Sequence, residues 1–459
     1  MDAIAVLNPY TGEEIGRVPR GTARDVERAV QAAREGARQM RALPQHRRVA
    51  ILAAAAQRLT AEAEPLAHLL TAETGKTIRE ARAEVARAAT ILQLASEEAR
   101  RLHGETIPFD ALPATEGRKG FYVREPVGIV GAITPWNVPL ALVAHKVGPA
   151  LGAGNAVILK PAEQTPLIAL QLARILRECG LPEQALHVVT GYGEEAGDAL
   201  VTHPDVPFLT FTGSREVGMQ LPARAGYKRI TLELGGNSPV IITPSADLEQ
   251  AAEGIVRGGF AVAGQLCISV QRVLVQESVV DALIRELLPR VRALRVGDPR
   301  DEHTDMGTLI HRHACDRVER DVQEAMAAGA ILLTGGQRLG PTLYAPTVLQ
   351  NVPRQARIAV EEAFAPVVLL MPYTTLEDAI ALANATAYGL NAGIFTRDLE
   401  EALTAAQEIV AGTVCVNDVP TFRSDLMPYG GRKQSGLGRE GVRFAMEEMT
   451  ELKVVSFRL

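Results

Sequence analysis

Apolar residues recur at helical spacing through the first hundred residues of the chain. Between Thr22 and His103 the sequence is rich in Ala, Arg and Glu, and its apolar positions fall on single helix faces. Two such stripes are Val26, Val30, Ala33, Ala37 and Met40, and Val85, Ala89, Leu92 and Ala95. Thr22 and Asp25 have the spacing of a capping box, and Gly75 or Gly104 would serve as a helix stop. The pattern predicts a run of helices over 22–103, without the sustained heptads of a coiled coil.

From Val127 the pattern changes to short apolar runs that alternate with glycine-rich turns and longer amphipathic stretches. The runs cover 128–134, 156–159, 186–189, 207–211 and 230–234. Helical stretches cover 167–178, 194–202 and 216–225. Strands that alternate with helices in this way predict a mostly parallel sheet with both faces covered. Ligands of such sheets bind beyond the carboxyl ends of the strands.

A second series of the same kind follows Cys267. It comprises strands over 272–276 and near Ile331, Val367, Gly393 and Val414, with helices over 279–294 and 315–328. A further strand is expected over 452–457, where it could pair with another element or with another subunit. The fold class is therefore α/β.

Composition narrows the function classes. A chain of 459 residues that is 47% hydrophobic exceeds the needs of one small core and indicates two or three domains. The net charge of −6 argues against a nucleic-acid partner. No apolar run reaches the roughly 18 residues of a membrane span, and the first ten residues carry an acid where a secretory signal needs a base. We therefore expect a cytoplasmic protein with no membrane partner.

Two glycine-rich turns follow predicted strands. Gly191, Gly193 and Gly197 form a GxGxxxG pattern, one residue longer than the dinucleotide fingerprint. The second turn, Thr212-Gly213-Ser214, precedes a predicted helix whose first N–H groups could bind a phosphate. Both turns are also compatible with ordinary strand-to-helix connections.

Three residues are candidates for chemistry. Cys267 lies in a small turn before a strand, where a thiol can be exposed, whereas Cys415 lies within an apolar run. Glu233 stands between two leucines and before two glycines, and a carboxylate in such a place needs a partner or a raised pKa. Asn137 is held between prolines, as an oxyanion-hole donor would be. The alternatives are a buried cysteine, a capping or salt-bridging acid and a helix-capping asparagine.

Two other clusters suggest chemistry that we discount. His311, His313 and Cys315 alternate as metal ligands can, but they stand at a polar helix start. Glu361 and Glu362 are adjacent on the chain, so they do not face each other across a substrate as an acid–base pair would. We expect no metal site.

Taken together, the motifs resemble the aldehyde dehydrogenase superfamily nearly from end to end. The blocks that carry the resemblance are Asn8 to Gly12, Thr134 to Asn137, Lys160 to Pro166, Phe211 to Ser214, Glu233 to Gly236, Gly264 to Cys267, Glu362 to Pro366 and Pro428 to Gly431. The family implies a Rossmann-type cofactor domain over 1–103 and 124–234 and an α/β catalytic domain over 235–434. It also implies a small β oligomerisation arm and tail over 104–123 and 435–459, which would form homodimers or homotetramers.

The same resemblance assigns roles to residues. Cys267 is the expected nucleophile, Glu233 the base, and Asn137 with the Cys267 backbone N–H the oxyanion hole. The expected cofactor contacts are Thr134, Pro135, Trp136, Lys160, Glu163, Gly193, Gly197, Phe211, Gly213, Ser214, Leu234, Gly235, Glu362 and Phe364. A carboxylate at Glu163 would accept hydrogen bonds from a free ribose hydroxyl and repel a 2′-phosphate, so NAD is the first expectation and NADP the second.

The substrate side is expected to be polar. Val138, Leu142 and His145 fall on one helical face after Asn137, and Leu266, Ile268, Arg423 and Tyr429 complete the expected substrate contacts. His145 and Arg423 are polar and potentially cationic, which favours a short hydroxylated or anionic aldehyde. The segment 420–429 resembles the branch that handles lactaldehyde, phosphonoacetaldehyde or glyceraldehyde 3-phosphate. The alternative is that Arg423 pairs with Asp425 or a neighbour.

Two other functions remain open at this stage. Members of the superfamily that transfer the acyl group to CoA lack the base at the position of Glu233, so its presence favours hydrolysis. A non-catalytic binding or structural protein is the second alternative, and the combination of Cys267, Glu233 and Asn137 argues against it.

Overall fold

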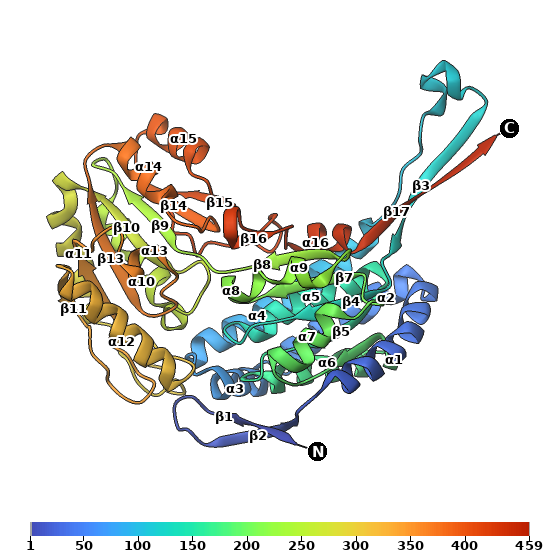
Figure 1. Ribbon diagram of the computed structural model, residues 1–459, viewed down its shortest axis with the longest axis horizontal. Coiled ribbons are helices and arrows are strands. Elements are labelled where there is room, and N and C mark those ends of the chain that lie inside the picture. Colours follow the sequence, from blue (N-terminus) through green and yellow to red (C-terminus); the bar gives the residue numbers. More distant parts are fainter. Residues whose placement is uncertain (1, 459) are drawn as a thin grey trace.

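Two open sheets organise the chain in the computed structural model, which describes residues 2–458 (Figure 1). Met1 and Leu459, at the ends of the expected first and last segments, lie outside the described residues. Each sheet belongs to one lobe, and a two-stranded arm projects away from both. The expected alternation of strands and helices is confirmed in both lobes.

The first sheet has six strands in the order β16-β8-β7-β4-β5-β6, and only β16 runs antiparallel to its neighbour. Its strands are β4 (Ile129–Ile133), β5 (Ala156–Lys160), β6 (Leu186–Val188), β7 (Phe208–Thr212), β8 (Arg229–Glu233) and β16 (Gly436–Leu437). Alternate residues of β4 enter different cores: Val130 and Ala132 on one face, Ile129 and Ile133 on the other. Both faces are therefore buried, as a parallel sheet requires.

Helices cover both faces of this sheet. They are α1 (Ala23–Ala42), α2 (Gln45–Ala61), α3 (Ala63–Thr74), α4 (Ile78–Arg101), α5 (Pro139–Ala153), α6 (Pro166–Glu178), α7 (Asp198–Thr202), α8 (Arg215–Gly218), α9 (Leu221–Ala225) and α16 (Val442–Glu448). The capping box of Thr22 and Asp25 is formed, and Gly75 ends α3 with a left-handed φ of 72°. The prediction for Gly104 is wrong, because α4 ends at Arg101 and its cap, Leu102, is extended.

The predicted helix over 216–225 is also wrong in detail, since it is two short helices. Pro222 stands in the first turn of α9, where its missing N–H costs nothing, and it could not continue α8. The helix expected over 194–202 begins as a wider π turn at Gly193–Gly197 before α7.

The second sheet has seven strands in the order β11-β12-β13-β10-β9-β14-β15, of which only β11 is antiparallel to its neighbour. The strands are β9 (Ser238–Ile242), β10 (Val270–Gln276), β11 (Ile331–Thr334), β12 (Thr347–Gln350), β13 (Val367–Tyr373), β14 (Asn391–Phe395) and β15 (Thr413–Val416). The helices of this lobe are α10 (Leu248–Phe260), α11 (Val280–Arg292), α12 (Arg312–Ala327), α13 (Arg357–Val360), α14 (Leu376–Asn384) and α15 (Leu399–Glu408). One continuous apolar core joins them.

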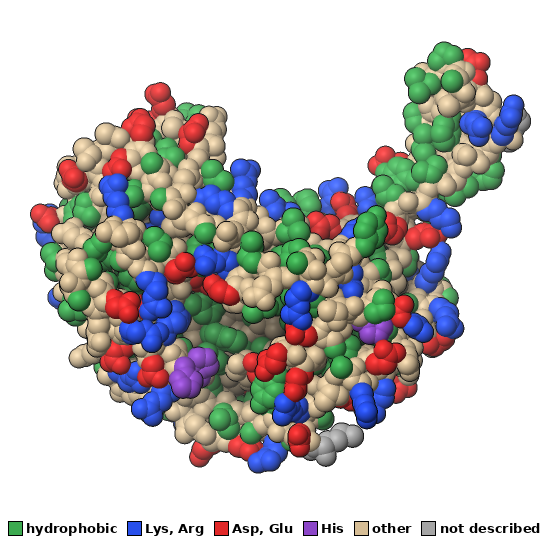
Figure 2. All heavy atoms as spheres, in the orientation of Figure 1, with side chains coloured by type: hydrophobic (Ala, Val, Ile, Leu, Met, Phe, Trp, Pro, Cys, Tyr) green, Lys and Arg blue, Asp and Glu red, His purple; other side chains and the backbone are tan. Residues whose placement is uncertain are grey.

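The arm consists of β3 (Arg118–Pro126) and β17 (Thr450–Arg458), which pair antiparallel along their whole lengths. Two short 3-10 turns, Phe109–Ala111 and Pro113–Thr115, precede β3. Apolar side chains gather on the arm in Figure 2. Leu452 is 57% exposed, Val454 59% and Phe457 50%. A second small sheet, β1 (Ala3–Leu7) with β2 (Glu14–Pro19), lies at the amino-terminal end.

Candidate active site

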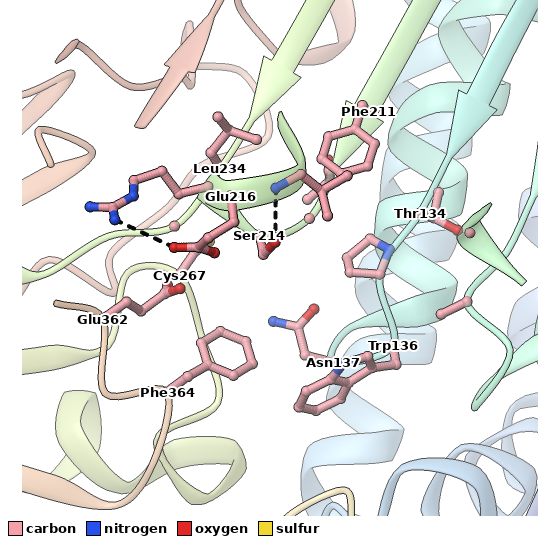
Figure 3. Close-up of a pocket in the computed structure, with 18 of the residues that line it drawn as sticks. Thr134, Trp136, Asn137, Phe211, Ser214, Glu216, Leu234, Cys267, Glu362 and Phe364 are labelled. Carbon is pink, nitrogen blue, oxygen red and sulfur yellow. Dashed lines mark hydrogen bonds and ion pairs between the residues drawn. The ribbon is translucent and has the colours of Figure 1, made fainter. Parts of the chain in front are cut away.

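A cavity of about 680 Å³ opens at the carboxyl ends of β4, β5, β7 and β8 and extends to the second lobe. Figure 3 shows Thr134, Trp136 and Asn137 on one side of it and Cys267, Glu362 and Phe364 across from them. On the face drawn in Figure 2, apolar side chains lie in a hollow between the two lobes. The cavity therefore lies where the strand pattern predicts a ligand site.

Most of the expected cofactor residues line this cavity. They are Thr134, Pro135, Trp136, Lys160, Glu163, Gly193, Phe211, Gly213, Ser214, Leu234, Gly235, Glu362 and Phe364, together with Asn137, Leu142 and Cys267. The remaining expected residues do not belong to its described lining: Gly197, Glu233, Val138, His145, Leu266, Ile268, Arg423 and Tyr429. Several of these lie behind Cys267, as described below.

Cys267 follows a strained turn. Val262 and Ala263 have left-handed φ angles of 51° and 53°, which L residues rarely adopt. The buried Gln265 side chain fixes the turn, because its amide nitrogen donates to the Val262 carbonyl and its oxygen accepts from the Ile310 N–H. Cys267 is thus presented to the cavity, half-buried, on a stiff support.

The Cys267 thiol is protonated at neutral pH. Burial raises its pKa to about 11, and the neighbouring Tyr429 hydroxyl, 3.3 Å from Sγ, acts in the opposite direction. Cys315 and Cys415 are buried in the second lobe, as expected of structural cysteines. The accessible thiol of the cavity is that of Cys267, and its chemistry requires activation.

Asn137 stands between β4 and α5. Its side-chain nitrogen donates to the Gln265 carbonyl at 2.8 Å, and its Oδ1 has no partner among the described residues. The residue at the cap of α5 is Val138, so Asn137 is not a helix cap. Its amide group instead lies at the boundary between the two lobes, beside the turn that carries Cys267.

A buried ion pair holds the Asn137 segment in place. The Lys76 ammonium group donates to the Asn137 carbonyl at 2.8 Å and pairs with Glu84. One Glu84 oxygen also accepts from the N–H groups of Leu140 and Ala141, at the start of α5. Glu84 therefore satisfies N–H groups that a helix start leaves free, and Lys76 fixes the backbone of the residue before it.

Glu233 ends β8 and is 3% exposed. Neither carboxylate oxygen has a hydrogen-bond partner among the described residues. Burial and the nearby negative charge of Glu440 raise the pKa of Glu233 well above its usual value. The surroundings thus favour the protonated form of this acid, and the absence of a partner within the described residues does not fit the capping or salt-bridging alternative.

The glycines after Glu233 bring the two lobes together. A Cβ atom at Gly236 would lie 2.1 Å from the Cys267 carbonyl oxygen, and one at Gly235 would lie 2.5 Å from a Glu362 oxygen. The Gly236 N–H donates to Glu362 at 3.0 Å. Only glycine allows this approach, so the turn fixes Glu233, Cys267 and Glu362 relative to one another.

The rest of the cavity fits a dinucleotide. Lys160 and Glu163 form an ion pair of 3.1 Å at one end, where both can reach ribose hydroxyls. The hydroxyls of Thr134 and Thr212 are buried at the cavity and have no partner among the described residues. Ser214 caps the short helix α8, so neighbouring N–H groups are available to a phosphate.

Aromatic rings lie beside this polar lining. Trp136 and Phe364 meet edge to face, with ring centroids 5.4 Å apart. Phe364 has a left-handed φ of 46°, and such strain in a non-glycine residue is concentrated at functional sites. The flat rings suit one aromatic group of a ligand.

Sequence reasoning missed several lining residues. Arg215 crosses from the first lobe to Glu361 of the second at 3.0 Å and lies over the ring of Tyr388. Arg317 and Arg357 line the cavity near Asp321. Arg215 directly follows the Thr-Gly-Ser turn, and this position alone could have identified it; the others lie on helices with no motif of their own.

The two polar residues expected to contact the substrate, His145 and Arg423, are both buried. His145 is buried against Asp425, with Nε2 2.8 Å from Oδ1, and burial followed by the charge of Arg423 lowers its pKa to about 4. The surroundings of His145 therefore favour its neutral form over the potential cation of the sequence interpretation. Arg423 is buried too, and it pairs with Glu440 at 3.1 Å, close to the alternative in which it binds a neighbour.

Asp425 and Glu440 bind the surrounding positive groups. Burial would raise the pKa of Asp425, but hydrogen bonds from His145 and Arg87 hold it below its usual range. Lys146 pairs with Glu440 at 2.7 Å. Leu266 and Ile268 lie in one apolar cluster with Tyr429, Leu390 and Cys267. A charged layer therefore stands behind the residues that surround the thiol.

Of His311, His313 and Cys315, the group discounted as a metal site, His311 has a structural role. His311 caps α12, with Nδ1 accepting from the Ala314 N–H at 3.0 Å, and Cys315 is buried. Within residues 2–458 no group of three or more His, Cys, Asp or Glu is arranged to hold a metal ion. Nor is any helix in that range long and apolar enough to cross a membrane.

Comparison with known proteins agrees with this geometry. Residues 1–455 match the aldehyde dehydrogenase family. A protein named aspartate-semialdehyde dehydrogenase 1, from Pseudomonas canavaninivorans, is 47% identical over 452 residues, covering 98% of this chain and 96% of that protein. The 3-sulfolactaldehyde dehydrogenase of Priestia megaterium is 44% identical over 458 residues, covering 100% and 95%.

Solved structures have the same fold. Aldehyde dehydrogenase 21 from Physcomitrella patens, in complex with the reaction product succinate, superposes with a TM-score of 0.96 at 40% identity, covering 100% of this chain and 95% of that one. The glyceraldehyde-3-phosphate dehydrogenase GapN of Methanocaldococcus jannaschii, complexed with NADP, gives 0.96 at 39% identity, covering 100% of both chains. The chain belongs to the aldehyde dehydrogenase family. It is an NAD(P)-dependent oxidoreductase of aldehydes, with the α/β fold that the sequence predicts.

Proposed function

We propose that this enzyme oxidises a short, polar or anionic aldehyde to the carboxylic acid, with Cys267 as nucleophile and hydrolysis as the last step. The observation that carries the proposal is the position of Cys267. Its thiol opens into a dinucleotide-sized cavity, next to Asn137 and close to a turn that begins at the unpaired acid Glu233.

In the first step the Cys267 thiolate attacks the aldehyde carbon, and the carbonyl electron pair moves onto oxygen. The alkoxide requires donors placed before the charge develops, and the Asn137 amide and the Cys267 N–H are suited to that role. The hydrogen bond from Lys76 keeps the Asn137 backbone fixed during the reaction.

We expect Asn137→Ala to lower kcat by about 10²- to 10³-fold in steady-state assays, because the alkoxide loses one of its donors.

Lys160, Glu163, Ser214, Glu362 and Phe364 are the residues that would hold the dinucleotide across the cavity. A nicotinamide held there would supply the acceptor for the hydride that leaves the substrate carbon. The carboxylate of Glu163, beside Lys160, supports a preference for NAD over NADP, because a 2′-phosphate would meet a negative charge there. The ratio of kcat/KM for the two cofactors tests this preference.

The remaining thioester is hydrolysed by a water molecule that gives a proton to Glu233, and the Cys267 sulfur leaves as the thiolate. Glu233 has to ionise first, since its pKa is raised. Its presence supports hydrolysis over transfer of the acyl group to CoA, the alternative reaction. Product analysis with and without CoA separates the two.

The substrate class rests on charge. Two relatives act, by name, on aspartate semialdehyde and 3-sulfolactaldehyde, and one structural neighbour holds succinate, so all three concern acidic compounds. Arg423 stands beside the Cys267 cluster, and its positive charge supports an anionic group on the substrate. Its ion pair with Glu440 means that such a group would share the guanidinium.

We further propose the division of labour expected from the sequence: residues 1–103 and 124–234 hold the cofactor, 235–434 carry the catalytic cysteine, and 104–123 with 435–459 join subunits. The exposed apolar arm supports a homodimer or homotetramer. Four free cysteines support a reducing compartment, and hence a cytoplasmic location.

A panel of aldehydes scored with both cofactors tests the function. We expect lactaldehyde, 3-sulfolactaldehyde and succinate semialdehyde to be oxidised with higher kcat/KM than a long alkanal, and Cys267→Ala to produce no NAD(P)H from any of them. Preference for the alkanal would exclude the substrate class, and activity of Cys267→Ala would exclude the nucleophile.

A further inference from the structure

The hydroxyl group of Tyr429 has an unusual partner. Tyr429 is 2% exposed, and the one hydrogen-bond partner of its hydroxyl within the described residues is Sγ of Cys267, at 3.3 Å. A buried tyrosine hydroxyl normally needs a partner, and a neutral thiol is a weak acceptor. The contact becomes strong only when the sulfur carries a negative charge.

Tyr429 is held rigidly in this position. Its backbone exchanges two hydrogen bonds with Glu440, one of 2.9 Å from its N–H and one of 2.7 Å to its carbonyl. The Arg423 guanidinium lies 3.7 Å from the centre of its ring and is fixed in turn by Glu440. A cation on the ring face draws electrons from the phenol, which makes its O–H group a better donor.

We propose that Tyr429 is a catalytic residue that donates a hydrogen bond from its hydroxyl to the Cys267 thiolate. The inference rests on Cys267 being the nucleophile and goes beyond the substrate contact expected of Tyr429 from the sequence. The direction of donation follows from chemistry: a thiolate has no proton to give, and the phenol keeps its proton because burial raises the pKa of Tyr429 well above its usual value.

The other groups around the sulfur do not by themselves stabilise the thiolate. Glu362 and Glu233, from the second and first lobes, disfavour the thiolate, while Arg423 favours it. Glu440 and Lys146 form the ion pair behind them. Burial is the largest effect and opposes ionisation, so a neutral donor in contact with Sγ lowers the thiol pKa without adding a further charge to the cavity.

The strength of the hydrogen bond from Tyr429 to Cys267 changes during the reaction. Once sulfur bonds to the substrate carbon it carries no charge and accepts poorly, so the hydroxyl acts before the attack and again when the thiolate leaves. Loss of the hydroxyl should therefore lower kcat/KM more than it lowers a kcat limited by addition of water to the thioester, during which the sulfur is uncharged.

The test measures the thiol itself. Inactivation by iodoacetamide is followed from pH 6 to pH 11 without aldehyde or cofactor, for the unmodified enzyme, Tyr429→Phe and the control Tyr344→Phe. Tyr344 is a buried tyrosine of the second lobe whose hydroxyl, unlike that of Tyr429, has no hydrogen-bond partner within the described residues. We expect Tyr429→Phe to raise the apparent pKa by about one unit and to slow alkylation at pH 7 about ten-fold, with no shift for Tyr344→Phe.

A second variant retains the fold. Replacement of Tyr429 by 3-fluorotyrosine makes the phenol more acidic and should lower the apparent thiol pKa, the opposite sign. An unchanged profile in both variants, or a raised KM for aldehyde with an unchanged profile, would overturn the proposal. Because alkylation needs no substrate, the result is independent of whether the aldehyde panel supports the proposed function.

Discussion

Two carboxyl groups near the nucleophile are equally buried, and the charges beside them give them different roles. Glu440 is paired with Lys146 and Arg423, and although burial opposes ionisation these charges hold its pKa below the usual range. Glu233 has no such partner within the described residues, and burial and the charge of Glu440 raise its pKa. The first is a fixed anion of the framework, and the second is a group that can exchange a proton during turnover.

Replacement of Glu233 by Gln should separate the two halves of the reaction. Glutamine has nearly the same shape but cannot take a proton from water, so the thioester forms and persists. We expect one burst of NAD(P)H, close to one equivalent per active subunit, followed by turnover reduced at least about 10²-fold in stopped-flow assays. Undiminished steady-state turnover in Glu233→Gln would refute the assignment of the base.

His145 makes stability depend on pH. Its pKa is about 4 in the folded protein against an ordinary 6.5, so below pH 6.5 the unfolded chain binds a proton that the folded chain refuses. The free energy of unfolding should therefore fall as pH drops from 6.5 to 4, by up to about 3 kcal/mol from this group. Buried acids with raised pKa values act oppositely, so the measurement compares urea unfolding of the enzyme with His145→Gln. Identical pH slopes for the two proteins would contradict the prediction.

At the scale of elements, the junction of α3 and α4 supports the segment between β4 and α5 that carries Asn137. Lys76 and Glu84 are both buried, and they join this junction to the start of α5 and to Asn137. Neither residue lines the cavity, so their effect on catalysis acts through position. Helices that are remote in sequence thereby determine where an amide group can meet the substrate oxygen.

Lys76→Met should be costly in two ways. It leaves Glu84 as a buried charge without its partner, which destabilises folding by about 3–5 kcal/mol in chemical denaturation. It also frees the Asn137 carbonyl, so kcat should fall while KM for the cofactor changes little. Lys119→Met, at an exposed lysine of the arm, is the matched control. A variant with normal stability and normal kcat would show that the pair is dispensable.

Sequence patterns predicted the elements well where local signals decide them. The alternation of short apolar runs with amphipathic stretches located β4, β5, β6, β7 and β8 of the first sheet but not β16, and the capping box of Thr22 located the start of α1. The break in 216–225 was visible as Pro222 but needed the observation that a proline belongs in the first turn of a helix. Gly104 failed as a stop because α4 had already ended at an extended Leu102.

The part of the site that could be predicted from sequence is the part that local motifs mark. Motifs mark residues whose surroundings are local, such as Asn137 between prolines and Glu233 before two glycines. The charge of His145 and the pairing of Arg423 depend on residues far along the chain, Asp425 and Glu440, and on burial that no local pattern encodes. For the same reason sequence reasoning placed Tyr429 near the substrate but not against the sulfur.

At the scale of the whole molecule, the arm formed by β3 and β17 is the part that the two lobes leave uncovered. On its outer side β3 is also hydrogen-bonded to residues 105–107, so within the described residues the free strand edge is that of β17, and the apolar side chains of the arm are exposed. Such a ribbon is stable in water mainly when another surface covers it.

Val454→Glu should weaken subunit association. Val454 is 59% exposed, and a charge there would be buried without a partner in a joined arm. We expect a smaller particle in size-exclusion chromatography with light scattering, at concentrations where the unmodified enzyme is oligomeric. Leu399→Glu, at a residue 74% exposed on α15, is the control for a charge added elsewhere. Equal masses for all three proteins would exclude the arm as the interface.

The pairing of β16 with β8 bears on how the enzyme is made. Residues 436–437 pair antiparallel with the strand that ends at Glu233 and form the edge of the sheet, and the Leu234 N–H donates to the carbonyl of Ser435, about two hundred positions later in translation. A nascent chain that has emerged only as far as residue 430 has both glycine turns and the thiol, yet the edge of its nucleotide sheet is bare. Catalytic competence should therefore arise late and abruptly during synthesis, and a ribosome-stalled chain of that length should offer chaperones an unfinished sheet edge rather than a half-active enzyme.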